Sequence, residues 1–122
     1  MKKFCIYVLC FFCLTAVVAA KGITFVDGLE DVPLMKGLEQ NTDNTFSFGN
    51  EESRFVETYL TSTKVGFKSV EKFYRESLPQ LGWLYQGTYE NTIVFYRDGE
   101  TLLFQKENSK PLKIRVTVKN RS

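Results

Sequence analysis

The sequence predicts an α+β fold, a two-layer sandwich in which one amphipathic helix (about residues 69–81) packs on an antiparallel sheet of four to five strands, in the order ββαββββ. Two patterns support this prediction. In one segment apolar residues recur every three or four positions, as on one face of a helix, and in the segments after it they alternate with polar residues, as on strands with one buried face. The chain of 122 residues is long enough for one domain.

The first twenty residues have the pattern of a signal peptide. Lys2 and Lys3 form a positive start, an uncharged apolar stretch runs from Phe4 to Val18, and small residues precede Lys21. We therefore expect residues 1–20 to be cleaved before Lys21 and the protein to be periplasmic or secreted. The alternative is an uncleaved signal that serves as a membrane anchor, although this stretch lies at the lower limit of length for spanning a bilayer.

Cysteine and histidine usage excludes several kinds of chemistry. The three cysteines (Cys5, Cys10 and Cys13) all lie in the predicted signal peptide, and the chain has no histidine. The mature chain therefore has no disulfide, no zinc site built from Cys or His, no cysteine nucleophile and no histidine triad. None of the cysteines follows a small residue, which disfavours lipidation. We expect neither a cofactor nor a metal.

The charge of the mature chain does not favour a nucleic-acid partner. Lys2 and Lys3 account for the formal net charge of +2. Without them the acidic and basic side chains balance, whereas a nucleic-acid binder concentrates positive charge. We expect no nucleic-acid partner.

Residues 21–43 are interpreted as an extended N-terminal segment, and residues 44–122 as the single α+β domain. Gly or Pro at positions 22, 28, 33 and 37 is too frequent for a helix or a long strand. Residues 40–44 form a polar break. The segment is expected to pack four apolar side chains onto the domain, namely Val32, Leu34, Met35 and Leu38.

A hairpin is predicted at the start of the domain, from residues 45–48 to a longer arm over 54–63 that alternates by twos. The helix follows, with charged residues on the face opposite its apolar stripe. Ser69 is the expected N-cap, and Pro79 should end the regular helix near Leu78 because it lacks a backbone N–H. The apolar stripe consists of Val70, Phe73, Tyr74, Leu78 and Leu81.

Strands are expected from Trp83 to the C-terminal end. Asp98-Gly99 is the strongest turn signal, because both central residues of a type I′ turn need positive φ. In the last strand, alternation directs one set of residues to the core and the other to solvent. The predicted strands cover residues 83–89, 92–97, 100–106 and 112–119, and the core set of the last strand is Leu112, Ile114, Val116 and Val118.

Three segments carry a resemblance: residues 31–38 (DVPLMKGL), 54–57 (RFVE) and 73–83 (FYRESLPQLGW). With the alternating strands after them, they are similar to an uncharacterised family of small exported alphaproteobacterial proteins with signal peptides, over most of residues 31–119. The βαβββ layout also resembles helix-grip-like periplasmic modules, including those of an outer-membrane assembly lipoprotein. The resemblance implies the cell envelope as location and a fold; it implies no activity and no catalytic residue.

The predicted sheet supplies a candidate binding surface. Val94, Tyr96 and Leu103 alternate to the side opposite the predicted core, and Lys113 and Arg115 should edge this apolar patch. We therefore expect a non-enzymatic envelope protein that binds a protein or peptide through the open sheet face or an edge strand. The competing interpretation is that aromatic and β-branched residues simply suit a half-buried sheet.

Two other functions are alternatives. A carrier of a small apolar ligand between helix and sheet would need a cavity bounded by Phe73, Phe95 and Phe104. A small hydrolase would need two converging carboxylates, for which Glu30–Asp31 and Glu51–Glu52 are the candidates. Because adjacent loop carboxylates usually face water in different directions, and because no catalytic motif is present, we expect that the protein is not an enzyme.

Overall fold

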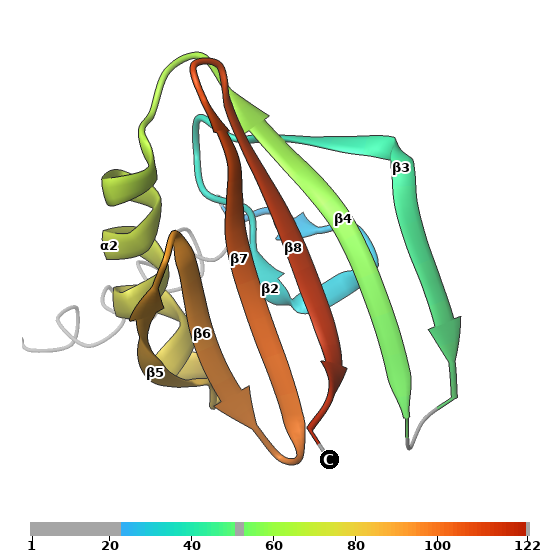
Figure 1. Ribbon diagram of the computed structural model, residues 1–122. Coiled ribbons are helices and arrows are strands. Elements are labelled where there is room, and N and C mark those ends of the chain that lie inside the picture. The colour runs from blue at the N-terminus through green and yellow to red at the C-terminus, as the bar shows by residue number, and fades with distance from the viewer. Residues whose placement is uncertain (1–22, 51–52, 122) are drawn as a thin grey trace, which may run out of the picture.

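The computed structural model describes residues 23–50 and 53–121, so the predicted signal peptide lies outside the described residues. The described chain forms two layers, as Figure 1 shows: an antiparallel sheet, and a helix with a short hairpin on one of its faces. The predicted α+β two-layer fold is confirmed. The main sheet has six strands instead of four to five, because every strand of the predicted ββαββββ order pairs into it.

The main sheet has the strand order β3-β4-β8-β7-β6-β5, and β1 and β2 form a separate two-stranded sheet. All pairs are antiparallel. In chain order the elements are β1 (Phe25–Val26), β2 (Leu29–Pro33), β3 (Glu39–Gly49), β4 (Arg54–Ser62), helix α2 (Phe67–Ser77), the 3-10 helix η1 (Leu78–Leu81), β5 (Leu84–Tyr89), β6 (Thr92–Arg97), β7 (Glu100–Ser109) and β8 (Leu112–Asn120).

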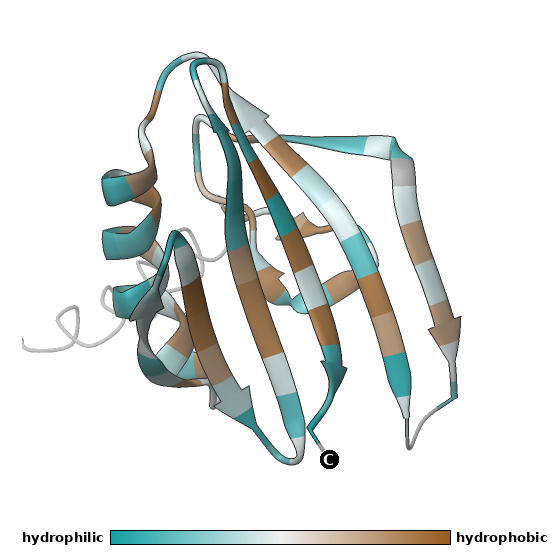
Figure 2. Ribbon diagram, viewed as in Figure 1, coloured by the Kyte–Doolittle hydropathy of each residue, from teal (hydrophilic) through white to brown (hydrophobic). Residues whose placement is uncertain are grey.

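The core lies against the inner face of the sheet, which we define as the face covered by α2 and the β1–β2 hairpin. Alternate residues of the central strands are buried there, and Figure 2 shows the corresponding hydrophobic bands along them. The period of two places every second side chain of a strand on this face. The predicted core set of the last strand is confirmed. The buried apolar residues of β4, β6, β7 and β8 are Val56, Leu60, Ile93, Phe95, Leu102, Phe104, Leu112, Ile114, Val116 and Val118.

Helix α2 begins before the predicted start. Its N-cap is Gly66, which is extended and makes no side-chain cap hydrogen bond, so the predicted N-cap at Ser69 is wrong. Starting earlier lets Phe67 pack against the core. The regular helix ends at Ser77 as predicted, and the residues around Pro79 continue as η1.

The centre of the helical stripe is buried, and its margins are not. Val70, Tyr74 and Leu78 are fully buried, at the spacing of four that defines one line along the helix. Phe73 is only partly buried, with its ring edge-on to Tyr74 at 4.8 Å between centroids. Leu81 is exposed. The prediction that both belong to the core face therefore holds for Phe73, which packs against the core, and is wrong for Leu81.

The N-terminal segment is folded rather than merely extended. β1 and β2 form a hairpin that buries Val26 and Leu29. Of the four side chains predicted to pack, Val32 and Leu38 are buried, and the other two lie partly buried against the core. The predicted polar break at residues 40–44 is part of β3, where the pairing with β4 shifts its register.

Two long-range hydrogen bonds fix this segment on the domain. The hydroxyl of Tyr74 donates to the carbonyl oxygen of Pro33 at 2.7 Å, and Trp83 Nε1 donates to the carbonyl oxygen of Asp31 at 3.3 Å. Trp83 and Tyr74 are both fully buried. The hairpin therefore closes the side of the core that the helix leaves open.

Candidate binding surface on the outer face of the sheet

The outer face of the sheet is the one opposite α2 and the hairpin. Val94, Tyr96 and Leu103 lie on this face, as the alternation predicts, and all three are half-buried. Val94 and Leu103 are directly opposite each other in the β6–β7 pair, and Leu84 of β5 is opposite Tyr96. Leu84 is 62% exposed. These four side chains form a continuous apolar patch, which we call the β5–β7 patch.

A cation covers part of this patch. The guanidinium carbon of Arg121 lies 4.4 Å from the centroid of the Tyr96 ring. Such contacts are attractive, because the ring face carries partial negative charge. The Tyr96 ring is therefore held in place by the C-terminal end of the described chain.

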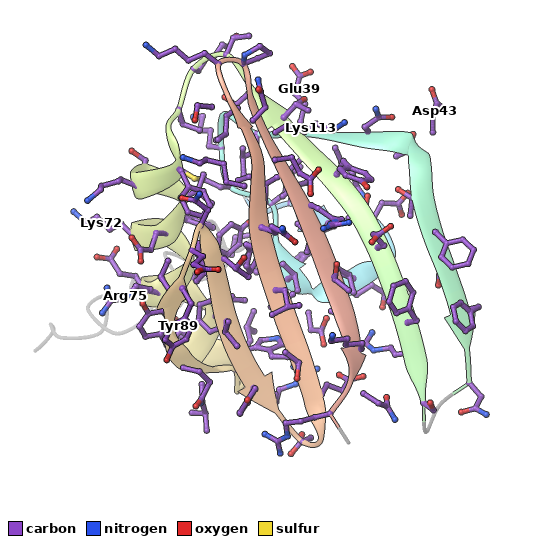
Figure 3. The ribbon with its side chains drawn as sticks, in the orientation of Figure 1. Glu39, Asp43, Lys72, Arg75, Tyr89 and Lys113 are labelled. Atoms are coloured by element: carbon purple, nitrogen blue, oxygen red, sulfur yellow. The ribbon has the colours of Figure 1, made fainter. Side chains whose placement is uncertain are left out.

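The two predicted basic residues have different surroundings. Arg115 donates to Gln105 at 2.7 Å and forms ion pairs with Glu107 at 3.2 Å and Glu57 at 3.9 Å. Because Arg115 pairs with Gln105, it lies diagonally beside Leu103. The ammonium of Lys113 lies 4.8 Å from the centroid of the Tyr59 ring, farther along β8, near the end of the sheet where Figure 3 labels it.

Sequence reasoning missed the other apolar group on the outer face. Phe46 and Phe48 of β3 and Phe55 of β4 form an aromatic triad, with ring centroids 5.3, 5.5 and 6.1 Å apart. Phe46 is 54% and Phe48 59% exposed. The alternation of Thr45-Phe-Ser-Phe shows that the two β3 rings share a face. Only the register with β4, in which Phe48 is opposite Phe55, shows that this face is the outer one.

The triad lies at an edge of the sheet. β3 is the first strand in the sheet order, and no other strand among the described residues pairs with its far side. Figure 1 shows that β3 bends sharply, and its register with β4 shifts between Asn41 and Phe46. Glu39 and Asp43 lie before or at this bend, as Figure 3 shows. The half of β3 from Thr45 to Gly49 has no charged residue.

A cluster of charged side chains closes one end of the core. Arg54 donates to both carboxylate oxygens of Glu100, at 2.7 and 2.9 Å, and to Asp31 at 3.3 Å. Arg97 donates to the same oxygen of Asp31, and its guanidinium carbon lies 4.2 Å from the Trp83 ring centroid. The hydrogen bond to Glu100 is the largest influence raising the pKa of Arg54. The cluster joins the hairpin to three strands of the sheet.

This cluster accounts for one of the candidate carboxylates of the hydrolase alternative. Asp31 pairs with two arginines, while its neighbour Glu30 is exposed, since successive residues of β2 point in opposite directions. The structure therefore does not bring Glu30 and Asp31 together. The second candidate pair, Glu51 and Glu52, lies outside the described residues. Within residues 23–50 and 53–121, no three His, Cys, Asp or Glu side chains form a group that could hold a metal ion.

The region predicted for an apolar cavity contains aromatic rings in contact. Phe104 stacks on Tyr74 with 4.3 Å between ring centroids, and Phe95 is edge-on to Phe104 at 6.1 Å. All three side chains are fully buried. The ring of Tyr74, which projects from α2, thus occupies the space between this helix and the two phenylalanines.

Comparison with known proteins gives no further indication of function: no family model, no curated protein and no solved structure matches the chain. The resemblance to small exported proteins and the periplasmic or secreted location therefore stay predictions. Of the helices in the described ranges, none has the length and apolar character needed to cross a membrane.

Proposed function

We propose that this chain is an exported, non-enzymatic protein of the cell envelope that binds a protein or peptide partner through the outer face of its sheet. The observation that supports this proposal is the contrast between the two faces. The inner face is covered by α2 and the hairpin. The outer face has no cover from any described element, yet it exposes large apolar side chains: Phe46, Phe48, Leu84 and Tyr89. Contiguous exposed apolar groups, such as Phe46 with Phe48 and Leu84 with its neighbours in the β5–β7 patch, are typical of interaction sites.

The polar groups of the outer face favour binding over chemistry. Arg115 is engaged with Gln105, Glu57 and Glu107. An enzyme needs polar groups that converge on a substrate, often with shifted pKa values. Around Arg115 the charges pair with one another instead, while Phe46, Phe48 and Leu84 stay exposed.

The same charge balance indicates the kind of partner. The ion pairs of Arg115 with Glu57 and Glu107 hold opposite charges close together, so these groups should contribute little long-range electrostatic steering. Apolar contact area should therefore dominate the affinity, and we expect the dissociation constant to change little with salt concentration. The partner should present apolar or aromatic side chains from an extended segment or a flat surface.

Site-specific photo-crosslinking in cells that produce and export the chain tests the proposal. A photoreactive residue at position 84 replaces the most exposed side chain of the β5–β7 patch. One at Lys72 lies on the solvent side of α2, which Figure 3 shows. We expect a discrete adduct from position 84 and none from position 72. Tyr96→Ala, opposite Leu84, should weaken that adduct without altering the far-UV circular dichroism spectrum.

The adduct must then be reproduced with purified components. Titration calorimetry with the identified partner should give saturable binding that Tyr96→Ala weakens at least tenfold and that salt changes little. Identical adducts from positions 84 and 72, or binding that Tyr96→Ala leaves unaltered, would overturn the proposal.

A further inference from the structure

The half of β3 from Thr45 to Gly49, which we call the open edge, has backbone groups on its far side that no described strand pairs. Phe46 and Phe48 project from the same half and are exposed by more than half of their surface. An uncovered row of backbone donors and acceptors beside apolar side chains is a template for another strand. The identity of that strand can be argued from hydrogen bonding, register and charge.

Hydrogen bonding at the tip of the β3–β4 hairpin shows which residues of β3 direct their backbone N–H and C=O groups to the far side, away from β4. The backbone N–H of Asn50 donates to the carbonyl oxygen of Ser53 at 2.8 Å, so these two residues form a hydrogen-bonded pair. In an antiparallel ladder, hydrogen-bonded and non-hydrogen-bonded pairs alternate. Counting back along the register, Phe48 and Phe46 direct their backbone groups to β4, and Ser47 directs its N–H and C=O to the far side.

A second copy of this strand fits the open edge with a two-fold axis at Ser47. Antiparallel pairing about that axis makes the two Ser47 residues a hydrogen-bonded pair. Phe46 of each copy is then opposite Phe48 of the other, in a non-hydrogen-bonded pair, the type with the closer side chains. Four phenyl rings meet on the outer face, and Phe55 of each copy lies next to them.

Charge also favours a second copy. No residue from Thr45 to Gly49 is charged, so pairing over this segment brings no like charges together. Glu39 and Asp43 belong to the other half of β3, before or at the bend. The pairing is therefore limited to the half of the strand that carries the phenylalanines.

The opposite edge of the sheet is less suited to pairing. The register of β5 with β6 shifts between Tyr85 and Gly87, and the hydroxyl of Tyr89 donates to the carbonyl oxygen of Gln86 at 2.8 Å. A bulge and an occupied carbonyl make an edge strand less able to pair with another strand. Since β5 is also uncharged, the regular pairing of residues 46–49 with β4 is what makes the edge of β3 the better suited of the two.

We propose that two copies of this chain form a symmetric dimer through the open edge, which joins their sheets into one and places their outer faces side by side. This inference rests on the proposed function, since it names a second copy as the partner of the aromatic triad. The dimer leaves the β5–β7 patch of each copy accessible to another protein. Self-pairing of this kind uses up the edge, so association stops at two copies.

Sedimentation equilibrium of the purified exported chain tests this dimer. We expect a reversible monomer–dimer equilibrium within the micromolar range. A variant with Phe46→Lys and Phe48→Lys should be monomeric, because each lysine meets a lysine across the axis. A variant with Phe46→Glu and Phe48→Glu should be monomeric for the same reason. Mixing the two should restore a dimer of one copy of each at low salt, since every pair then has opposite charges.

A cysteine at position 47 tests the register. The described chain contains no cysteine, and the Cα–Cα distance of about 5.5 Å in a hydrogen-bonded antiparallel pair lies within the range that a disulfide spans. Under a mild oxidant, Ser47→Cys should form a disulfide-linked dimer rapidly. Thr42→Cys, exposed but away from the axis, should crosslink slowly at the same protein concentration. Leu84→Lys should leave the dimer unchanged.

The failures of the two proposals are distinguishable. A wild-type chain that stays monomeric throughout the concentration range, or a mixture of charged variants that does not associate, overturns the dimer and leaves binding at the β5–β7 patch untouched. Equal crosslinking of Ser47→Cys and Thr42→Cys overturns the register. Absence of a specific adduct from position 84 overturns the proposed function without affecting the sedimentation result.

Discussion

Removing the hydroxyl of Tyr74 should destabilise the domain by about 1–3 kcal/mol, the cost of leaving a buried hydrogen-bonding group without a partner. The side chain is fully buried. Its hydroxyl donates to the carbonyl oxygen of Pro33 at 2.7 Å and accepts from the N–H of Met35 at 3.3 Å. Tyr74→Phe keeps the ring that stacks on Phe104, so the loss reports on the link between helix and N-terminal segment rather than on packing.

The same hydroxyl should make stability depend on pH in alkaline solution. Burial raises the pKa of Tyr74 well above its ordinary value of 10.0, because the phenolate would lose its contact with water. In the unfolded chain the phenol ionises near that ordinary value, so the folded state keeps a proton that the unfolded state releases. The contribution to stability is complete below about pH 10 and falls above it, by up to about 1.4 kcal/mol per pH unit.

Urea unfolding, followed by the fluorescence of the single tryptophan, Trp83, measures both effects. Tyr59→Phe is the matched control, because Tyr59 is half-buried on the outer face and its loss should stay within about 0.5 kcal/mol. Amide exchange of Met35 should accelerate in Tyr74→Phe alone. The reasoning is refuted if Tyr74→Phe is as stable as the wild type, or if the difference between them is the same at about pH 8 and about pH 11.

Three further outcomes can be measured directly. Mass spectrometry of the exported protein should place the amino terminus at Lys21, and an intact Met1 in the membrane fraction would indicate an anchor instead. Phe104→Ala should cost about 3–5 kcal/mol in urea unfolding as a core truncation, and Phe73→Ala clearly less, since Phe73 is only partly buried; equal losses would contradict the orientation of the helix. Gly82→Ala should cost about 1–2 kcal/mol, because residue 82 has φ +92°, and an unaltered thermal midpoint would count against this.

Local patterns were sufficient for the elements whose determinants lie close together in sequence. The spacing of Val70, Tyr74 and Leu78 identified the buried line of the helix, because a 3.6-residue period survives any tertiary arrangement. The Asp98-Gly99 turn was predictable for a similar reason, and both residues have positive φ, at 48° and 83°. The N-cap was not predictable, because the helix begins earlier than its local sequence signal, and this earlier start brings Phe67 into contact with the core.

The β1–β2 hairpin could not be predicted from local signals. Its strands are short, and the glycines and proline between and around them read as a loop. What makes Leu29 and Val32 part of the core is contact with Trp83 and its neighbours, far along the chain. No sequence pattern within residues 25–33 indicates that these residues contact that distant part of the chain.

The candidate surface was predictable in part. Alternation placed Val94, Tyr96 and Leu103 on the outer face, because a strand's own sequence fixes which residues share a side. The same rule grouped Phe46 with Phe48. It could not show which side they occupy, since that depends on the register with β4 after an irregularity in β3.

The position of the hairpin in the chain has a consequence for the order of folding. Asp31 takes its partners from Trp83 and Arg97, which follow it by 52 and 66 residues. Contacts across such separations require costly loop closure and slow the search for the native state. A chain emerging from a pore with its N-terminal end first would present Val26 and Leu29 to the surroundings until most of the remainder had followed. During that interval a holding chaperone, or a protease, would meet this hairpin first.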